Sequence, residues 1–184
     1  VKLPGLGLPA DKNTEGRADA TTHLAQYALK RRKVSGKFAK RSDIPVANQC
    51  GTLTLQLAKP ESLLVPVALT PSGPAPALDP LTHEVDHLLC YKAKAQKKRS
   101  DGTAVATLPK GTQVDAKDQF QTRRYDLRRA RLVCPPVAKS GTPVLLSGPK
   151  KGTTFPITAS TVRSATSGLV CYDARTARRR IEQT

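Results

Sequence analysis

An internal repetition constrains the fold of this chain more than any other feature of its sequence. Thr22–Lys30 and Asp86–Lys94 carry His, Leu and Tyr in the same places, at a shift of 64. Farther on, Ile44–Cys50 matches Val114–Phe120 at a shift of 70, and this shift continues without a gap into a Pro-Val-Ala segment of both copies. A Lys-rich loop in the second copy supplies the six extra residues. Such self-similarity is typical of supersecondary units that bury their apolar faces against one another.

The repetition also divides the chain into segments. A third start of the pattern lies at Gly168–Arg175, and we expect it to form only the opening strand of a third copy. The segment Thr70–Pro76 is rich in Pro and is typical of an extended linker. The expected order is an N-terminal arm (1–20), a first β repeat (21–69), a Pro-rich linker (70–82), a second β repeat (83–139), a turn-rich connection (140–167) and a partial third repeat with an Arg-rich C-terminal strand (168–184).

Local patterns within each copy favour β-strands. Leu53, Leu55 and Leu57 alternate with polar residues, which is the period of two that a half-buried strand shows. Tyr125 and Leu127 alternate with charged residues in the corresponding place of the second copy. The 15 Pro and 12 Gly are scattered along the chain and oppose long helices. The sequence therefore predicts an all-β fold of two tandem small antiparallel repeats, sandwich-like or barrel-like, plus a partial third repeat strand.

Two of the four cysteines can be paired from the repetition itself. The cysteines contain no C-x-x-C motif, and their wide spacing fits disulfides better than zinc. Cys90 and Cys134 lie where the first copy has Gln26 and Leu64, so both cysteines are missing together there. This joint absence is expected of two positions that face each other, and we predict a Cys90–Cys134 bond.

The remaining cysteines and the start of the chain indicate where the protein resides. Cys50 and Cys171 form a possible second pair, within one chain or between neighbouring chains. Disulfides form in oxidising compartments, and buried free thiols in a cytosolic basic protein are the alternative. The chain contains no Met and starts at Val1, as expected after removal of an export signal or after trimming. No apolar stretch approaches the ~18 residues of a membrane span, so a spanning protein is not expected. From the cysteines and the start of the chain we predict a secreted protein, extracellular or on the cell surface.

Several weak motifs recur in one order and carry a family resemblance. The second copy contains D-H-L-L-C-Y-K at 86–92, D-Q-F at 118–120 and L-V-C-P-P-V-A-K at 132–139. In this order they resemble an uncharacterised family of secreted bacterial β-repeat proteins, whose repeats run D-H-x-x-C-Y-K, D/N-Q-F-G and L-C-x-P-V-x-K. The first copy keeps His23 and Tyr27 but departs from the motifs at Gln26, Cys50 and Leu64. The resemblance covers about residues 21–175 and implies export and a β-rich repeat, with no known chemistry.

One motif suggests an enzyme. His83, Glu84 and His87 form H-E-x-x-H, which on a helix places two histidines on one face to bind zinc, with the glutamate as general base. The segment around His23 lacks this motif, and the residues after His87 belong to an expected strand. We therefore interpret the motif as a chance match and His87 as a structural residue. A nucleophile elbow and a phosphate-binding loop are absent from the sequence, so no enzyme, cofactor or metal is predicted.

Positive charge is the second strong signal. The chain has 31 Lys and Arg against 14 Asp and Glu, a formal net charge of +17. Such a positive field attracts acidic polysaccharide, lipopolysaccharide or nucleic acid. The alternative is that the charges only keep the surface solvated in an acidic or salty medium. Aromatic residues make up only 4%, so sequence-specific reading of bases is not expected. The candidate polyanion-binding residues are Arg31, Arg32, Lys97, Lys98, Arg123, Arg124, Arg128, Arg129, Arg178 and Arg179.

The start of the third copy leads to the main functional hypothesis. A lone strand leaves backbone N–H and C=O groups unpaired and must find a sheet edge. The expected assembly strand, Leu169, Val170, Cys171 and Tyr172, either folds back on its own chain or adds to a neighbouring copy. We therefore predict a non-enzymatic extracellular structural protein whose subunits self-associate through terminal β-strands into a filament or surface layer. The alternative is a secreted monomeric module that binds anionic polymers, and a small zinc hydrolase is a distant third.

Overall fold

The computed structural model describes residues 5–8, 11–12, 14, 22–30, 36–70, 73–75, 85–139, 152–154 and 161–177. These residues form nine strands and no helix. The strands are β1 (Gly5–Gly7), β2 (Asp11–Lys12), β3 (Thr22–Ala28), β4 (Arg41–Asn48), β5 (Gly51–Ala68), β6 (Leu88–Ala95), β7 (Gln113–Lys117), β8 (Thr122–Cys134) and β9 (Leu169–Thr176).

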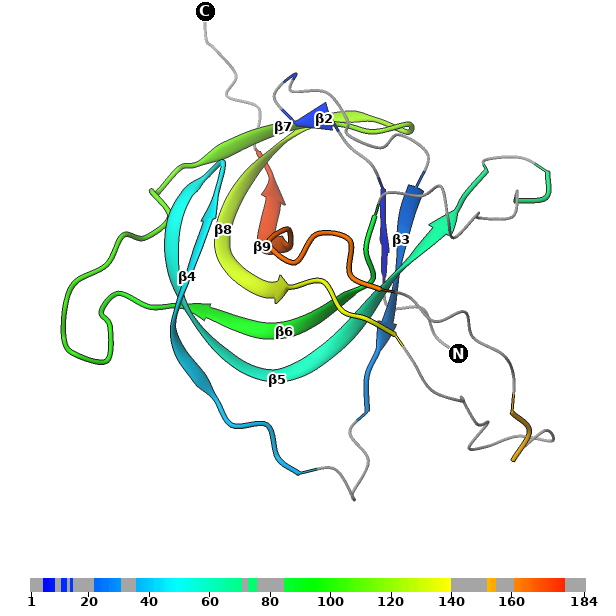
Figure 1. Cartoon of the computed structure of the whole chain (residues 1–184). Helices are drawn as coiled ribbons and strands as arrows, with labels where there is room; N and C mark the ends of the chain where they lie inside the picture. Colours follow the sequence, from blue (N-terminus) through cyan, green and yellow to red (C-terminus); the bar gives the residue numbers. More distant parts are fainter. Residues whose placement is uncertain are drawn as a thin grey trace, which may run out of the picture.

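All nine strands belong to one antiparallel sheet. The main path runs β1-β3-β5-β6-β8-β7-β2, with β4 paired to β5 and β9 paired to β8. In Figure 1 the long strands β5, β6 and β8 curve around an open half-barrel, and β9 follows β8. The all-β class is as predicted. The division into two separate sandwich-like or barrel-like units is not confirmed, because β5 pairs directly with β6 and strands of both expected repeats share the sheet.

The two expected repeats pair their strands in corresponding registers. On β3 and β5, Tyr27 lies opposite Leu63. On β6 and β8, Tyr91 lies opposite Val133, which is the same pair after the shifts of 64 and 70 found in the sequence. The hairpins β4–β5 and β7–β8 correspond in the same way. A long strand with two shorter partners on one edge is therefore the common pattern of both halves.

The ladders on the opposite edge of each long strand also correspond. Ser62 of β5 lies opposite Cys90 of β6, and Leu132 of β8 lies opposite Cys171 of β9. Both ladders contain two register shifts, in corresponding places. Such shifts mark β-bulges, which bend a strand and increase its twist. The half-barrel therefore curves at equivalent points of β5 and β8.

The apolar core consists of two clusters that use opposite faces of β6. Leu88 and Cys90 belong to one cluster, whereas Ala93 and Ala95 contribute to the other. Alternate residues of a strand point to opposite faces, so the buried face changes along β6. The first cluster also contains Leu64, Leu132 and Cys134, and the second contains Leu53, Leu55 and Ala130.

The D-Q-F motif forms the turn between β7 and β8. The Asp118 carboxylate accepts hydrogen bonds from the backbone N–H groups of Phe120 and Gln121, both at 2.8 Å. At the corresponding turn of the first half, the Asn48 side-chain oxygen accepts from the Cys50 N–H at 2.7 Å. Asp and Asn stabilise such turns because their short side chains bond the backbone two residues on. The motif is therefore explained by local structure.

Asp43 ties β4 to the loop after β6. Its φ of 60° lies in the left-handed region, which Asp tolerates better than most residues. Its carboxylate accepts the Ser100 N–H at 3.1 Å and a Gln96 side-chain N–H at 3.2 Å. Hydrogen bonds from Ser100, then Gln96, and the charge of Arg99 lower the pKa of Asp43 from 3.8, while desolvation opposes this. The charged form is therefore favoured in the folded state.

We expect Asp43→Asn to reduce stability in a pH-dependent manner. Because the folded pKa of Asp43 lies below its unfolded value, its charge stabilises the protein above the unfolded pKa, and this contribution is lost as the pH falls through the folded pKa. The wild type should therefore exceed the variant in free energy of unfolding at neutral pH, and the gap should close in acid. Urea unfolding over that pH range measures the gap. A gap that stays constant would assign the loss to the altered turn rather than to the charge.

Candidate assembly edge beside the disulfide

A buried disulfide joins β6 to β8. Cys90 and Cys134 are bonded, with an S–S distance of 2.04 Å, and both are fully buried. Cys90 and Cys134 are the next directly opposite pair after Tyr91 and Val133 in the ladder between β6 and β8. Side chains approach each other most closely at non-hydrogen-bonded pairs of an antiparallel ladder. The bond is consistent with the predicted pairing.

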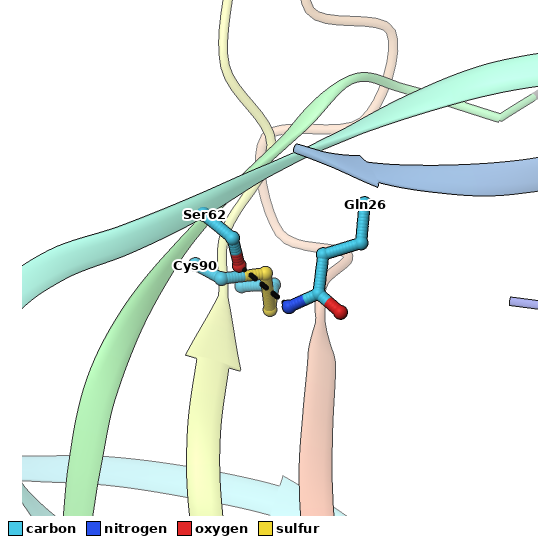
Figure 2. Close-up of a disulfide and its surroundings, with 4 residues drawn as sticks. Gln26, Ser62 and Cys90 are labelled. Carbon is cyan, nitrogen blue, oxygen red and sulfur yellow. Dashed lines mark hydrogen bonds between the residues drawn. A yellow bond between two sulfur atoms is a disulfide. The ribbon is translucent and has the colours of Figure 1, made fainter. Parts of the chain in front are cut away.

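In the first half, a hydrogen bond replaces the disulfide. Gln26 lies opposite Leu64, which are the two positions that correspond to the cysteines. The Gln26 side-chain N–H donates to the Ser62 hydroxyl at 2.9 Å, and Ser62 is 1% exposed. Ser62 in turn lies opposite Cys90 in the next ladder. Figure 2 shows this bond and the disulfide across adjacent strands. The polar pair is satisfied, so its burial costs little.

The first and last family-like motifs of the second copy meet at the start of β6. The Asp86 carboxylate accepts the backbone N–H groups of Arg163 at 2.9 Å and Ser164 at 3.0 Å. His87 Nε2 lies 3.1 Å from Lys139 Nζ, and a lysine ammonium donates to an acceptor at this distance. Asp86 and His87 are both buried. Sequence reasoning did not single out Asp86, although it opens the D-H-x-x-C-Y-K motif.

The predicted assembly strand forms β9, which pairs with β8 along one edge. Leu169 lies opposite Cys134, and Val170 lies opposite Val133. Among the described residues, β9 has no strand partner other than β8. Leu169 is 42% exposed, whereas Leu88, at the corresponding place of β6, is 4% exposed. β6 is covered on both edges, by β5 and β8. The second edge of β9 therefore remains open within the described chain.

The possible second pair of cysteines is not bonded in this structure. Cys50 and Cys171 are free thiols. Cys171 packs against the cluster around the disulfide, and burial raises the pKa of its thiol. The neighbouring Tyr172 accepts a hydrogen bond from the Asn48 side-chain amide at 2.8 Å, which connects β9 to the β4–β5 turn. Burial raises the pKa of Tyr172, and this hydrogen bond opposes the shift. Pairing of the two cysteines between chains stays a prediction.

The structure gathers four of the predicted polyanion-binding residues on β8. Arg124 makes two 2.7 Å hydrogen bonds to Asp115, and Arg129 contacts Asp173 at 2.6 Å. The arginines around Asp173 lower the pKa of this carboxyl, chiefly through the hydrogen bond from Arg129. Exposed Lys97 and Lys98 lie in the loop after β6, and Arg123 and Arg128 are exposed on β8. Arg31, Arg32, Arg178 and Arg179 lie outside the described residues.

Only one of the three defining residues of the H-E-x-x-H match, His87, lies within the described part of the chain. His83 and Glu84 lie outside the described residues, and His87 contacts Lys139. Within the described ranges, no group of three His, Cys, Asp or Glu side chains is placed to hold a metal ion. No described segment forms a helix with the length and hydrophobicity needed to cross a membrane. Comparison of the chain with family models, curated proteins and solved structures finds no significant match.

Proposed function

We propose that this chain is a non-enzymatic extracellular structural protein that self-associates into a filament or surface layer through its β9 edge. The observation that carries the proposal is the open edge of β9, beside an exposed Leu169 at a position that is buried in β6. An uncovered strand edge is a template for pairing with another chain. The buried Cys90–Cys134 bond supports an oxidising, extracellular setting, because such bonds persist there.

The ladder geometry identifies which backbone groups the open edge presents. Successive residues of an antiparallel strand direct their backbone groups to opposite edges. Val137 donates its N–H to the His87 carbonyl, so the odd-numbered residues at this end of β8 point toward β6. Cys134 therefore points toward β9, where it meets Leu169. It follows that Leu169 bonds β8, whereas Val170 directs its N–H and C=O to the open edge.

We expect Val170→Pro to abolish assembly while leaving the monomer folded. Proline removes the outward N–H of β9 and leaves the ladder bonds to β8 intact, because proline is tolerated on edge strands. Val170→Ala is the matched control, since it removes side-chain packing but keeps the N–H. Light scattering after size exclusion and negative-stain electron microscopy measure assembly, and circular dichroism measures folding. Assembly of the proline variant at the wild-type level would exclude this edge.

A second candidate is a secreted monomer that binds anionic polymers. The favouring observation is the row of arginines on β8, where one carboxylate, Asp173, faces several arginines. Monodisperse wild-type particles of 19.8 kDa under all conditions would remove the assembly proposal. Retention on heparin up to high salt would then favour the second candidate, because binding to polyanions weakens with salt in proportion to the contacts made.

A further inference from the structure

The two long strands have equivalent neighbours on both edges. β5 lies between β3 and β6, and β8 lies between β6 and β9. The registers agree as well, since Ser62 meets Cys90 on one ladder and Leu132 meets Cys171 on the other. At this end, a long strand of this protein therefore has a short strand on each edge, in a fixed register, while β4 and β7 pair with the other end of β5 and β8.

The N-terminal strand β1 occupies the place of a long strand beside β3. Gly5 lies opposite Gln26, and Gly7 lies opposite Leu24. On β6, the positions that correspond to Gln26 and Leu24 are covered by Ser62 and Leu64 of β5. Gly7 therefore corresponds to Leu64 of β5 and, in the next half, to Cys134 of β8.

The sequence after β1 supports this correspondence. Placing Gly7 on Cys134 aligns Leu-Gly-Leu-Pro-Ala-Asp-Lys (6–12) with Val-Cys-Pro-Pro-Val-Ala-Lys (133–139). Pro9 then matches Pro136, and Lys12 matches Lys139. The expected N-terminal arm thus contains a segment, β1, that corresponds to the end of a long strand. The hydrophobic pattern could not reveal it, because β1 has only three residues.

In the described residues, β1 and β9 have complementary missing partners. β1 takes the place of a long strand and lacks a short strand on one edge, and β9 is a short strand that lacks a long strand on one edge. In the described residues, β1 pairs only with β3, although long strands carry a short strand on both edges. Within the same residues, β9 is a short strand with no long strand on its second edge. Leu6 on β1 is 43% exposed and Leu169 on β9 is 42% exposed, and no strand of the described residues covers either edge.

We propose that β9 of one copy pairs with β1 of the next copy, with Cys171 opposite Gly7, and this inference rests on the proposed function. The register repeats the native one: Cys171 takes the place of Cys90, and Gly7 takes the place of Cys134. Tyr172 then lies opposite Leu6, as Tyr91 lies opposite Val133. The partner is a second copy of this chain, because β1 and β9 are complementary edges that stay unpaired with each other within the described residues. Such a contact is head-to-tail and continues unless a rotation closes a ring.

Disulfide trapping tests the register. In a Cys50→Ser background, Gly7→Cys should cross-link to Cys171 of the neighbour, because the equivalent native positions form a disulfide. Diamide accepts the two electrons and two protons that the two thiols release. A side chain at Gly7 needs a small movement of Leu24, whose Cβ lies 3.3 Å from an added Cβ. Oxidation should yield dimers, trimers and longer ladders on non-reducing gels.

The control and the linked peptide make the result specific. Leu6→Cys in the same background faces the opposite side of the strand and should link about tenfold less, because disulfide geometry is restrictive. Mixing ¹⁴N- and ¹⁵N-labelled Gly7→Cys chains should give a peptide that joins position 7 to Cys171 and contains both isotopes. If Gly7→Cys fails to fold, Gly5→Cys with Asp173→Cys and Cys171→Ser probes the same register, which corresponds to the pair Lys92 and Leu132.

Each remaining outcome contradicts a defined part of the inference. A link between position 7 and Cys171 within one chain would show that β9 closes its own barrel. Assembled chains without this link, or with links between like cysteines, would overturn the register and leave the proposed function standing. Absence of assembly in the Cys50→Ser parent and the wild type would overturn the proposed function, and the inference with it.

Discussion

Replacing Cys90 and Cys134 together with alanine is expected to lower the free energy of unfolding by about 4 kcal/mol, the largest effect that we predict. The bond joins residues 44 apart, and a cross-link of that span restricts the unfolded chain strongly. Both sulfur atoms are also fully buried in the first apolar cluster, so their removal leaves unfilled space. Chain entropy and packing therefore act in the same direction.

Urea unfolding of the double variant and the wild type measures this loss. Cys50→Ser is the matched control, because Cys50 is a free thiol in a turn and should leave the midpoint nearly unchanged. The wild type in the presence of a reductant should approach the double variant. Equal midpoints for the double variant and the wild type would show that the bond does not stabilise the folded chain.

The repetition in the sequence could predict more of the pairing than the local patterns could. The shifts of 64 and 70 match the registers that place Tyr27 opposite Leu63 and Tyr91 opposite Val133. The alternation of Leu53 and Leu55 likewise indicated β5, but not its length of 18 residues. Pro60 interrupts the pattern there. In the structure it lies at a register shift, where a missing N–H is tolerated.

Contacts between segments far apart in the sequence could not be predicted. Asp43 meets Ser100 across 57 residues, and Asp86 meets Ser164 across 78. Neither contact has a local periodicity, because each depends on where the curved sheet places two segments that are distant in the sequence. At the candidate site, β9 was expected from its likeness to β6. β1 was expected only as part of an arm, since Gly-Leu-Gly is too short for a period of two to show.

The second large effect that we expect concerns Asp86. Asp86→Ala should lower the free energy of unfolding by about 3 kcal/mol, because two charge-assisted hydrogen bonds to a buried carboxylate are lost together. Asp86 is only 8% exposed, so solvent cannot replace these bonds fully, and the N–H groups of Arg163 and Ser164 lose their acceptor. Asp86→Asn should lose about 1 kcal/mol, because its amide oxygen still accepts. Chemical denaturation measures both variants.

Asp118→Ala is the matched control, because it removes the same kind of carboxylate–backbone hydrogen bonds at a site that is less buried and joins residues close in sequence. Asp118 also accepts two backbone N–H groups, but they belong to Phe120 and Gln121 in its own turn, and water reaches them when the carboxylate is removed. Asp118→Ala should therefore lower the free energy of unfolding by only about 1 kcal/mol.

Asp86 acts over a long span, because it ties the segment that leads into β9 to the start of β6. Asp86→Ala should consequently weaken assembly as well as stability, whereas Asp118→Ala should leave assembly unchanged. Equal losses of stability in both alanine variants, with assembly intact in both, would contradict a role for Asp86 in positioning the open edge.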